Sequence, residues 1–336
     1  MPANLTPAYK AAEAHYKRAK EPSDRLDALK EMLKAIPKHK GTEHLQGDIK
    51  AKIRELTDEV SGPRKGGART GPSTVVRPEG AGQIALLGPP NSGKSTLHAK
   101  LTGSHAEAGA YPFTTQHPLP GMMPVHDVRI QLVDLPPIAV EHPVPWISNA
   151  LYPADGCLLI VDVAQPGVVE RVIDLHRILE ERKVVLTGRW PSDGPPDTET
   201  ELFTKVLPTL LVAAKTDHPE ASEQELAVLE ELADLDYPYI AVSTETGRGV
   251  DELGGWLFDH LGVIRVYTKI PGKDPDMDQP YTMRPGATVE DVAVLVHRDI
   301  AAALRFARVW SDHGFAGQHV GRDHLVVDRD ILELHA

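Results

Sequence analysis

A glycine-rich segment ends in a lysine and two hydroxyl residues, in the order Gly88, Pro89, Pro90, Asn91, Ser92, Gly93, Lys94, Ser95 and Thr96. An apolar run at 83–87 precedes it, and a helix-like stretch follows it. Glycines let a backbone wrap closely around phosphates, so that successive N–H groups and the next helix N-terminus face an anion. Lys94 would reach the β- and γ-phosphates, and the Ser95 hydroxyl would ligate Mg²⁺. In this strand–loop–helix context, the segment predicts a loop that binds a nucleoside triphosphate through these residues.

An acidic residue, Asp134, ends a second apolar run at 129–133. A carboxylate at the end of a strand beside a phosphate loop can hold Mg²⁺, usually through water. Between the loop and this residue lies the segment 111–115, Tyr-Pro-Phe-Thr-Thr, in which Thr115 could complete the metal shell. The sequence therefore predicts a magnesium site made of Ser95, Thr115 and Asp134.

A third group of residues, Lys215-Thr216-Asp217, follows an apolar run that starts at 209. The carboxylate of Asp217 can accept two hydrogen bonds from guanine, at N1–H and N2–H. Adenine offers no matching pair of donors, so this carboxylate would select guanine. Ser243 and Thr244 follow the run 239–242 and would support the base through backbone N–H groups. These residues disfavour a phosphate-loop kinase or ATPase.

The elements that carry these motifs alternate between strands and helices from 83 to about 261. Helical stretches such as 167–182 and 222–234 separate the apolar strand candidates, which are 83–87, 128–133, 157–162, 183–187, 209–213 and 239–242. This alternation predicts an α/β domain with a mostly parallel sheet and helices on both faces. The segment 190–197, rich in proline, interrupts the pattern and is predicted to be an exposed loop.

Segments with different sequence patterns flank this region. Apolar residues at helical spacing between 7 and 60 predict a helical hairpin with a cationic tip at 37–40 and an N-cap at Ser23-Asp24. The C-terminal segment predicts a small α+β module, with a helix from the capping box at Thr288 to about 302 and strands at 263–268, 307–310, 317–320 and 324–327. The predicted domains are therefore a hairpin (1–61), a flexible basic linker (62–80), a phosphate-loop domain (81–262) and the C-terminal module (263–336).

The motifs in this order resemble those of the translation-factor class of GTPases, and Tyr-Pro-Phe-Thr-Thr resembles the Obg group within it. The tail from Ile264 resembles a TGS domain, a β-grasp fold. Together with a basic helical hairpin, this arrangement resembles the DRG-type (developmentally regulated GTP-binding) proteins. The resemblance implies a P-loop GTPase domain that binds GTP with Mg²⁺ and hydrolyses it to GDP and phosphate. It also implies action on ribosomes or RNA through the hairpin and the TGS domain.

Three departures from the family pattern bear on catalysis. Pro137 stands where a glycine N–H normally contacts the γ-phosphate, and proline has no N–H. Ala214 replaces an asparagine that helps to fasten the base, and a proline-containing stretch, 138–146, replaces a glycine-rich mobile segment. These changes favour slow hydrolysis, and they leave open a nucleotide-binding scaffold for ribosome or RNA with little or no GTPase activity.

The water-orienting glutamine of Ras-like enzymes is also missing, because Ile138 holds that position. In some relatives an asparagine placed like Asn91 ligates a monovalent cation beside the β–γ bridge, so K⁺ is a candidate second cofactor. The alternative is an amide that only stabilises the loop. Catalysis would then rest on Lys94, on Asn91 with its cation, and on Mg²⁺ held in part by Thr115.

Composition agrees with a cytoplasmic protein that has no membrane partner. Hydrophobic residues make up 41% and charged residues 25% of the 336-residue chain, as in ordinary soluble globular proteins. The one cysteine, Cys157, lies in an apolar run, which indicates an inert buried thiol. The net charge of −12 hides an asymmetry, because residues 1–80 carry 16 Lys and Arg against 11 Asp and Glu. A basic arm on an acidic body suggests a contact with RNA or the ribosome.

Overall fold

The computed structural model describes residues 6–19, 21–37, 42–60, 74–104, 116–194, 201–311, 314 and 316–336. The chain forms two compact units. The first comprises Met1–Arg77 with Thr200–Phe203, and the second comprises Pro78–Glu199 with Thr204–Ala336. Among the described residues, no helix has both the length and the apolar character needed to span a membrane.

The first unit is helical, with α1 (Pro7–Arg18), α2 (Pro22–Ala35) and α3 (Glu43–Val60) among its described residues. The expected hairpin thus has its first arm divided into two helices. The backbone is extended at Ala19, and Pro22 then occupies the first position of α2, where its missing N–H is harmless. The N-cap is therefore Glu21 and not Ser23. The expected tip lies mostly outside the described residues.

The larger sheet of the second unit has seven strands, β1 (Gln83–Leu87), β2 (Leu119–Val125), β3 (Val128–Asp134), β4 (Gly156–Asp162), β5 (Val184–Thr187), β6 (Lys205–Ala214) and β7 (Tyr239–Ala241). Their order is β2-β3-β1-β4-β6-β5, and β7 also pairs with β6. All pairs are parallel except β2 with β3. The prediction of a mostly parallel sheet is therefore confirmed.

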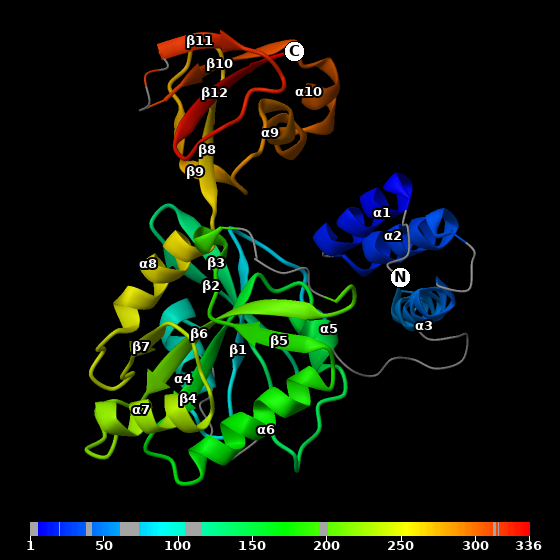
Figure 1. The fold of residues 1–336 in the computed structure, drawn as a ribbon. Coiled ribbons are helices and arrows are strands. Elements are labelled where there is room, and N and C mark those ends of the chain that lie inside the picture. The colour runs from blue at the N-terminus through cyan, green and yellow to red at the C-terminus, as the bar shows by residue number, and fades with distance from the viewer. Residues whose placement is uncertain are drawn as a thin grey trace, which may run out of the picture. The chain divides into compact units, whose positions relative to one another are not determined.

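Helices cover both faces of this sheet (Figure 1), namely α4 (Lys94–Thr102), α5 (Ile147–Leu151), α6 (Val168–Glu180), α7 (Glu223–Leu232) and α8 (Val250–His260). The central strands are buried on both sides, which explains their continuous apolar sequences. The segment expected to be an exposed loop begins with a buried residue, Trp190, which is only 2% exposed. Its indole Nε1 donates to the carbonyl of Thr209 at 3.2 Å, so this residue belongs to the core and the expectation was wrong there.

Cys157 lies in the centre of this sheet, on β4. Its side chain is fully buried, and its sulfur lies 3.3 Å from the hydroxyl of Thr209. Burial raises the pKa of the Cys157 thiol to about 12. The thiol is therefore protonated and inert at neutral pH, as the sequence indicated.

The smaller sheet has five strands in the order β11-β10-β12-β8-β9. They are β8 (Ile264–Lys269), β9 (Asp276–Met283), β10 (Phe306–Trp310), β11 (Ala316–Val320) and β12 (Asp330–His335). Two helices, α9 (Val289–Val296) and α10 (Arg298–Ala303), pack apolar residues onto the sheet. The expected strand at 324–327 is wrong: only one bridge, between Leu325 and Thr288, occurs there, and the last strand begins at Asp330. The capping box at Thr288 is present.

Two arginines, Arg265 on β8 and Arg284 just after β9, form ion pairs with residues that border strands of the larger sheet. Arg265 reaches Asp127, in the β2–β3 turn, at 2.9 Å, and it also pairs with Asp328, just before β12 of its own sheet, at 2.7 Å. Tyr267 also donates a hydrogen bond to Asp127. Burial pushes the pKa of Asp127 upward, but the hydrogen bonds from Tyr267 and Arg265 outweigh it and hold the pKa below its ordinary value. Arg284 pairs with Asp155, just before β4, at 2.6 Å.

Candidate nucleotide-binding site

The phosphate loop connects β1 to α4 and needs glycine at two places. A Cβ on Gly88 would lie 2.2 Å from the carbonyl oxygen of Ile160 on β4, so a larger residue would force the loop off the sheet. Gly93 caps α4 with a φ of 96°, a conformation that favours glycine. Asn91 also has a positive φ, 62°, which asparagine tolerates better than most residues. The sequence thus builds a loop that ends at the N-terminus of α4.

Lys94 is folded onto this loop. Its ammonium donates to the carbonyl oxygens of Gly88 at 3.2 Å and Pro89 at 2.9 Å, and its side chain is buried. Burial lowers the pKa of Lys94 to about 8, although the nearby carboxylate of Asp134 opposes that shift. An anionic phosphate stabilises an ammonium group more strongly than neutral carbonyl oxygens do, so we expect Lys94 to turn toward a bound phosphate.

The side chains of Ser95 and Asp134 contact each other beside the phosphate loop. The Ser95 hydroxyl donates to the Asp134 carboxylate at 2.6 Å, and Asp134 is fully buried. Hydroxyl and carboxylate oxygens are the ligands that Mg²⁺ prefers, so these two side chains fit the metal that the fold implies. Thr115, the third expected ligand, lies outside the described residues. Within the described part, no group of three or more His, Cys, Asp or Glu side chains could hold another metal ion.

Lys215 joins the phosphate loop to the predicted base-selecting corner. Its ammonium donates to the carbonyl of Asn91 at 2.9 Å and pairs with Asp162 at 2.8 Å. Asp162 ends β4, and sequence reasoning missed it. The sequence did contain a pattern that could have identified it, because Asp162 comes at the end of an apolar strand in the same way as Asp134 does.

Asp217 and Ser243 come together at the same corner. A hydrogen bond from Ser243 is the main cause that holds the pKa of Asp217 below its ordinary value, so this exposed carboxylate is ionised at neutral pH. The backbone N–H of Ser243 donates to the carbonyl of Arg248 at 3.0 Å. Ser243 therefore acts on Asp217 through its hydroxyl. Thr244, the neighbouring expected residue, is partly buried.

The segment after Asp134 closes against the loop. Pro137 and Ile138 are buried, and the N–H of Ile138 donates to the carbonyl of Gly88 at 3.3 Å. The first N–H after the proline is thus engaged with the loop itself. Val140, two residues further, is 53% exposed. Ala214 ends β6 with only 6% of its surface exposed, at the position where an asparagine was expected.

These features define a class of protein: a phosphate-loop GTPase domain, on a mostly parallel sheet, followed by a small mixed sheet. Residues 83–188 match the family model described as "50S ribosome-binding GTPase", and residues 264–336 match the TGS domain.

Comparisons with curated sequences place the chain within one family. An uncharacterized GTP-binding protein of Methanocaldococcus jannaschii is 31% identical, over 93% of this chain and 92% of its own. Developmentally-regulated G-protein 2 of Arabidopsis thaliana is 27% identical over 93% of this chain and 90% of its own. The chain belongs to the family of developmentally regulated GTP-binding proteins. Among solved structures, a GTP binding protein from Pyrococcus horikoshii OT3 covers 76% of this chain and 99% of its own, with 17% identity and a TM-score of 0.48.

Proposed function

We propose that this protein binds GTP with Mg²⁺ and hydrolyses it slowly to GDP and phosphate. The observation that carries the proposal is Lys215, which holds the phosphate loop at Asn91 and the strand end at Asp162 while Asp217 lies two residues away. This arrangement couples binding of the phosphates to recognition of the base. Guanine selectivity follows from the ionised carboxylate of Asp217, which can accept two hydrogen bonds from guanine.

In the proposed reaction, a water oxygen attacks the γ-phosphorus, and the bond to the bridging oxygen breaks. The electron pair leaves with GDP, and the proton of the water passes to the phosphate product or to solvent. Lys94 and the loop N–H groups would stabilise the charge that develops on the phosphate oxygens. Ser95 and Asp134, together with Thr115, would hold Mg²⁺, which neutralises phosphate charge when bound.

Slow hydrolysis is expected because the segment after Asp134 offers the γ-phosphate fewer backbone N–H donors. Pro137 has no N–H, and the N–H of Ile138 donates to the loop carbonyl at Gly88. The same observation favours the second candidate, a nucleotide-binding scaffold with little or no hydrolysis. K⁺ held at Asn91 would supply positive charge beside the β–γ bridge and would favour the hydrolytic function.

The proposed partner is the ribosome or its RNA, reached through the basic helical unit and the TGS domain. Support comes from the excess of Lys and Arg in the first 80 residues, and from the description of the matched family. Work at the ribosome would place the protein in the cytoplasm.

Multiple-turnover hydrolysis, measured with and without purified ribosomes, tests the proposal. We expect slow release of phosphate from GTP and none from ATP, with an increase when ribosomes are added. Lys94→Met serves as the inactive control. Tight GTP binding without phosphate release in either condition would favour the scaffold, and equal binding of ATP and GTP would contradict the guanine site.

A further inference from the structure

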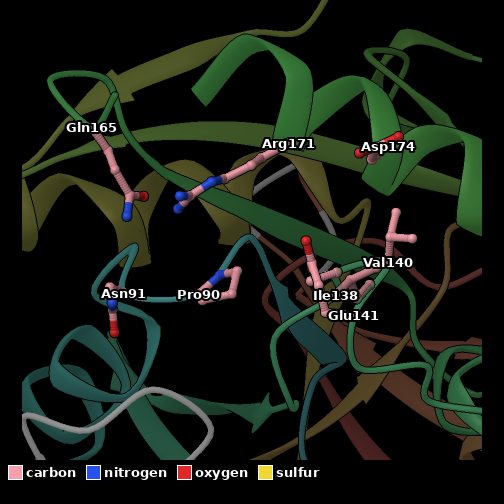
Figure 2. Close-up of a pocket in the computed structure, with 9 residues that line it drawn as sticks. Pro90, Asn91, Ile138, Val140, Glu141, Gln165, Arg171 and Asp174 are labelled. Atoms are coloured by element: carbon pink, nitrogen blue, oxygen red, sulfur yellow. The ribbon is translucent and has the colours of Figure 1, made fainter. Parts of the chain in front are cut away.

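A cavity of about 300 Å³ lies beside the phosphate loop (Figure 2). One wall is the loop, at Pro90 and Asn91, and a second wall is the segment after Pro137, from Ile138 to Glu141. The third wall is the beginning of α6, with Arg171. Because the γ-phosphate of a bound nucleotide lies between the phosphate loop and the segment that follows Asp134, this cavity opens onto the reacting end of GTP.

The cationic side chain in this cavity is Arg171. Figure 2 shows its side chain extending from α6 into the cavity, with the guanidinium between Gln165 and Pro90. In the part of the chain that the structure describes, this guanidinium has no ion-pair or hydrogen-bond partner. By contrast, Arg177, on the same helix, is paired with Asp174. Arg171 is therefore exposed, has no such partner among the described residues, and extends toward the phosphate loop.

The wall formed by the segment after Asp134 lacks the donors that usually contact the γ-phosphate. Pro137 has no N–H, the N–H of Ile138 donates to the Gly88 carbonyl at 3.3 Å, and the side chain of Ile138 is apolar. Two contacts that ordinarily stabilise the γ-phosphate and orient water are thus missing from that wall. A planar guanidinium offers two parallel N–H groups at fixed spacing, which suits phosphate oxygens.

We propose that Arg171 contacts the γ-phosphate in the transition state and supplies the positive charge for hydrolysis from within the chain. The inference rests on the proposed GTPase function and adds a catalytic residue to it. Water still attacks the γ-phosphorus and GDP still leaves with the bridging oxygen. Arg171 donates hydrogen bonds to the γ-phosphate oxygens as their charge grows. An arginine supplied in this way by the same chain is an established solution among GTP-hydrolysing proteins.

The test compares Arg171→Ala and Arg171→Lys with the unchanged protein in single-turnover GTP hydrolysis. We expect Arg171→Ala to lower the rate about a hundredfold to a thousandfold, because a lost transition-state donor has effects of that size. Arg171→Lys should restore only part of the rate, since lysine cannot form the paired contact. GDP affinity should stay the same in both variants. Arg129→Ala, an exposed arginine at the other end of β3 from Asp134, is the matched control.

A second readout does not depend on turnover. GDP with aluminium fluoride mimics the planar phosphoryl group, and the unchanged protein should trap it while Arg171→Ala should not. Both measurements are made in KCl and in NaCl. An active wild-type protein with an equally active Arg171→Ala variant that still traps aluminium fluoride would overturn the role of Arg171 alone. A wild-type protein that neither hydrolyses GTP nor traps the analogue would instead refute the proposed function itself.

Discussion

At the scale of single residues, the proposed selection of guanine rests on the carboxylate of Asp217. Asp217 is exposed, and the hydroxyl of Ser243 keeps it ionised by lowering its pKa. An ionised carboxylate only accepts hydrogen bonds, whereas guanine presents two donors on the facing edge. We therefore expect base selectivity to depend on this one side chain and to change when it is replaced.

Asp217→Asn should shift the preference from guanosine to xanthosine nucleotides, because the amide adds a donor where xanthine has a carbonyl. We expect a loss of one to two orders of magnitude in GTP affinity, of the size that an unpaired polar contact produces. Competition binding with GTP and XTP measures the shift. Asp259→Asn, an exposed position near the end of α8, is the control. Unchanged preference in Asp217→Asn would show that another group reads the base.

Asn91 allows a second test at this scale. If its amide holds K⁺, hydrolysis should be faster in KCl than in NaCl at equal ionic strength. Because Asn91 has a φ of 62°, glycine removes the amide with less backbone strain than alanine does. Asn91→Gly should therefore erase the difference between the two salts while nucleotide binding persists. Identical rates of the unchanged protein in both salts would leave this amide with a structural role only.

At the scale of elements, we expect the segment after Asp134 to set the difference in affinity between GTP and GDP. Pro137 withholds one backbone donor, and a hydrogen bond to a charged acceptor contributes about 1.5–3 kcal/mol. Its absence from the GTP complex should reduce the preference for GTP by roughly tenfold to a hundredfold.

We therefore expect similar affinities for GDP and a non-hydrolysable GTP analogue, and Pro137→Gly should favour the analogue. Calorimetric titration of each protein with each ligand measures both. Since Pro137 is buried, Pro137→Ala, which also restores the N–H with less added chain freedom, is the second variant. A strong preference of the unchanged protein for the analogue would mean that the N–H of Ile138 leaves Gly88 and binds the phosphate.

The elements also show what the sequence could and could not predict. Strands such as β1 and β4 are buried on both faces, so their apolar runs identified them. β2 contains two prolines and β9 is mostly exposed, as edge strands allow, and neither gave a recognisable pattern. Site residues that belong to short sequence motifs could be predicted. Arg171 belongs to no such motif, and only the path of the chain from β4 into α6 brings it near the phosphate loop.

At the scale of the whole second unit, Asp127 joins the two sheets, since it lies in the β2–β3 turn and binds Arg265 and Tyr267 of β8. Asp127→Asn should lower the free energy of unfolding by about 1–3 kcal/mol at pH 7, because it weakens charged hydrogen bonds that are partly shielded from water. Chemical denaturation measures the loss, and Asp278→Asn, on the exposed part of β9, is the control.

The effect should depend on pH in a defined direction. Folding lowers the pKa of Asp127, so its contribution is complete above the ordinary aspartate value of about 3.9 and falls as the pH drops through the folded-state value. The difference between the unchanged protein and Asp127→Asn should therefore be constant from pH 7 to 5 and shrink below pH 4. A difference that persists unchanged at pH 3 would contradict this assignment.

The burial of Cys157 gives the protein a practical property. Because the chain has one cysteine and its thiol is closed inside β4 with a pKa near 12, maleimide reagents should leave the native protein untouched. A cysteine introduced at Val140, which is 53% exposed, would then be the single attachment point for a fluorophore. Such a dye would stand at the rim of the cavity that holds Arg171, and its emission would report nucleotide exchange in real time without removal of any native residue of the phosphate loop.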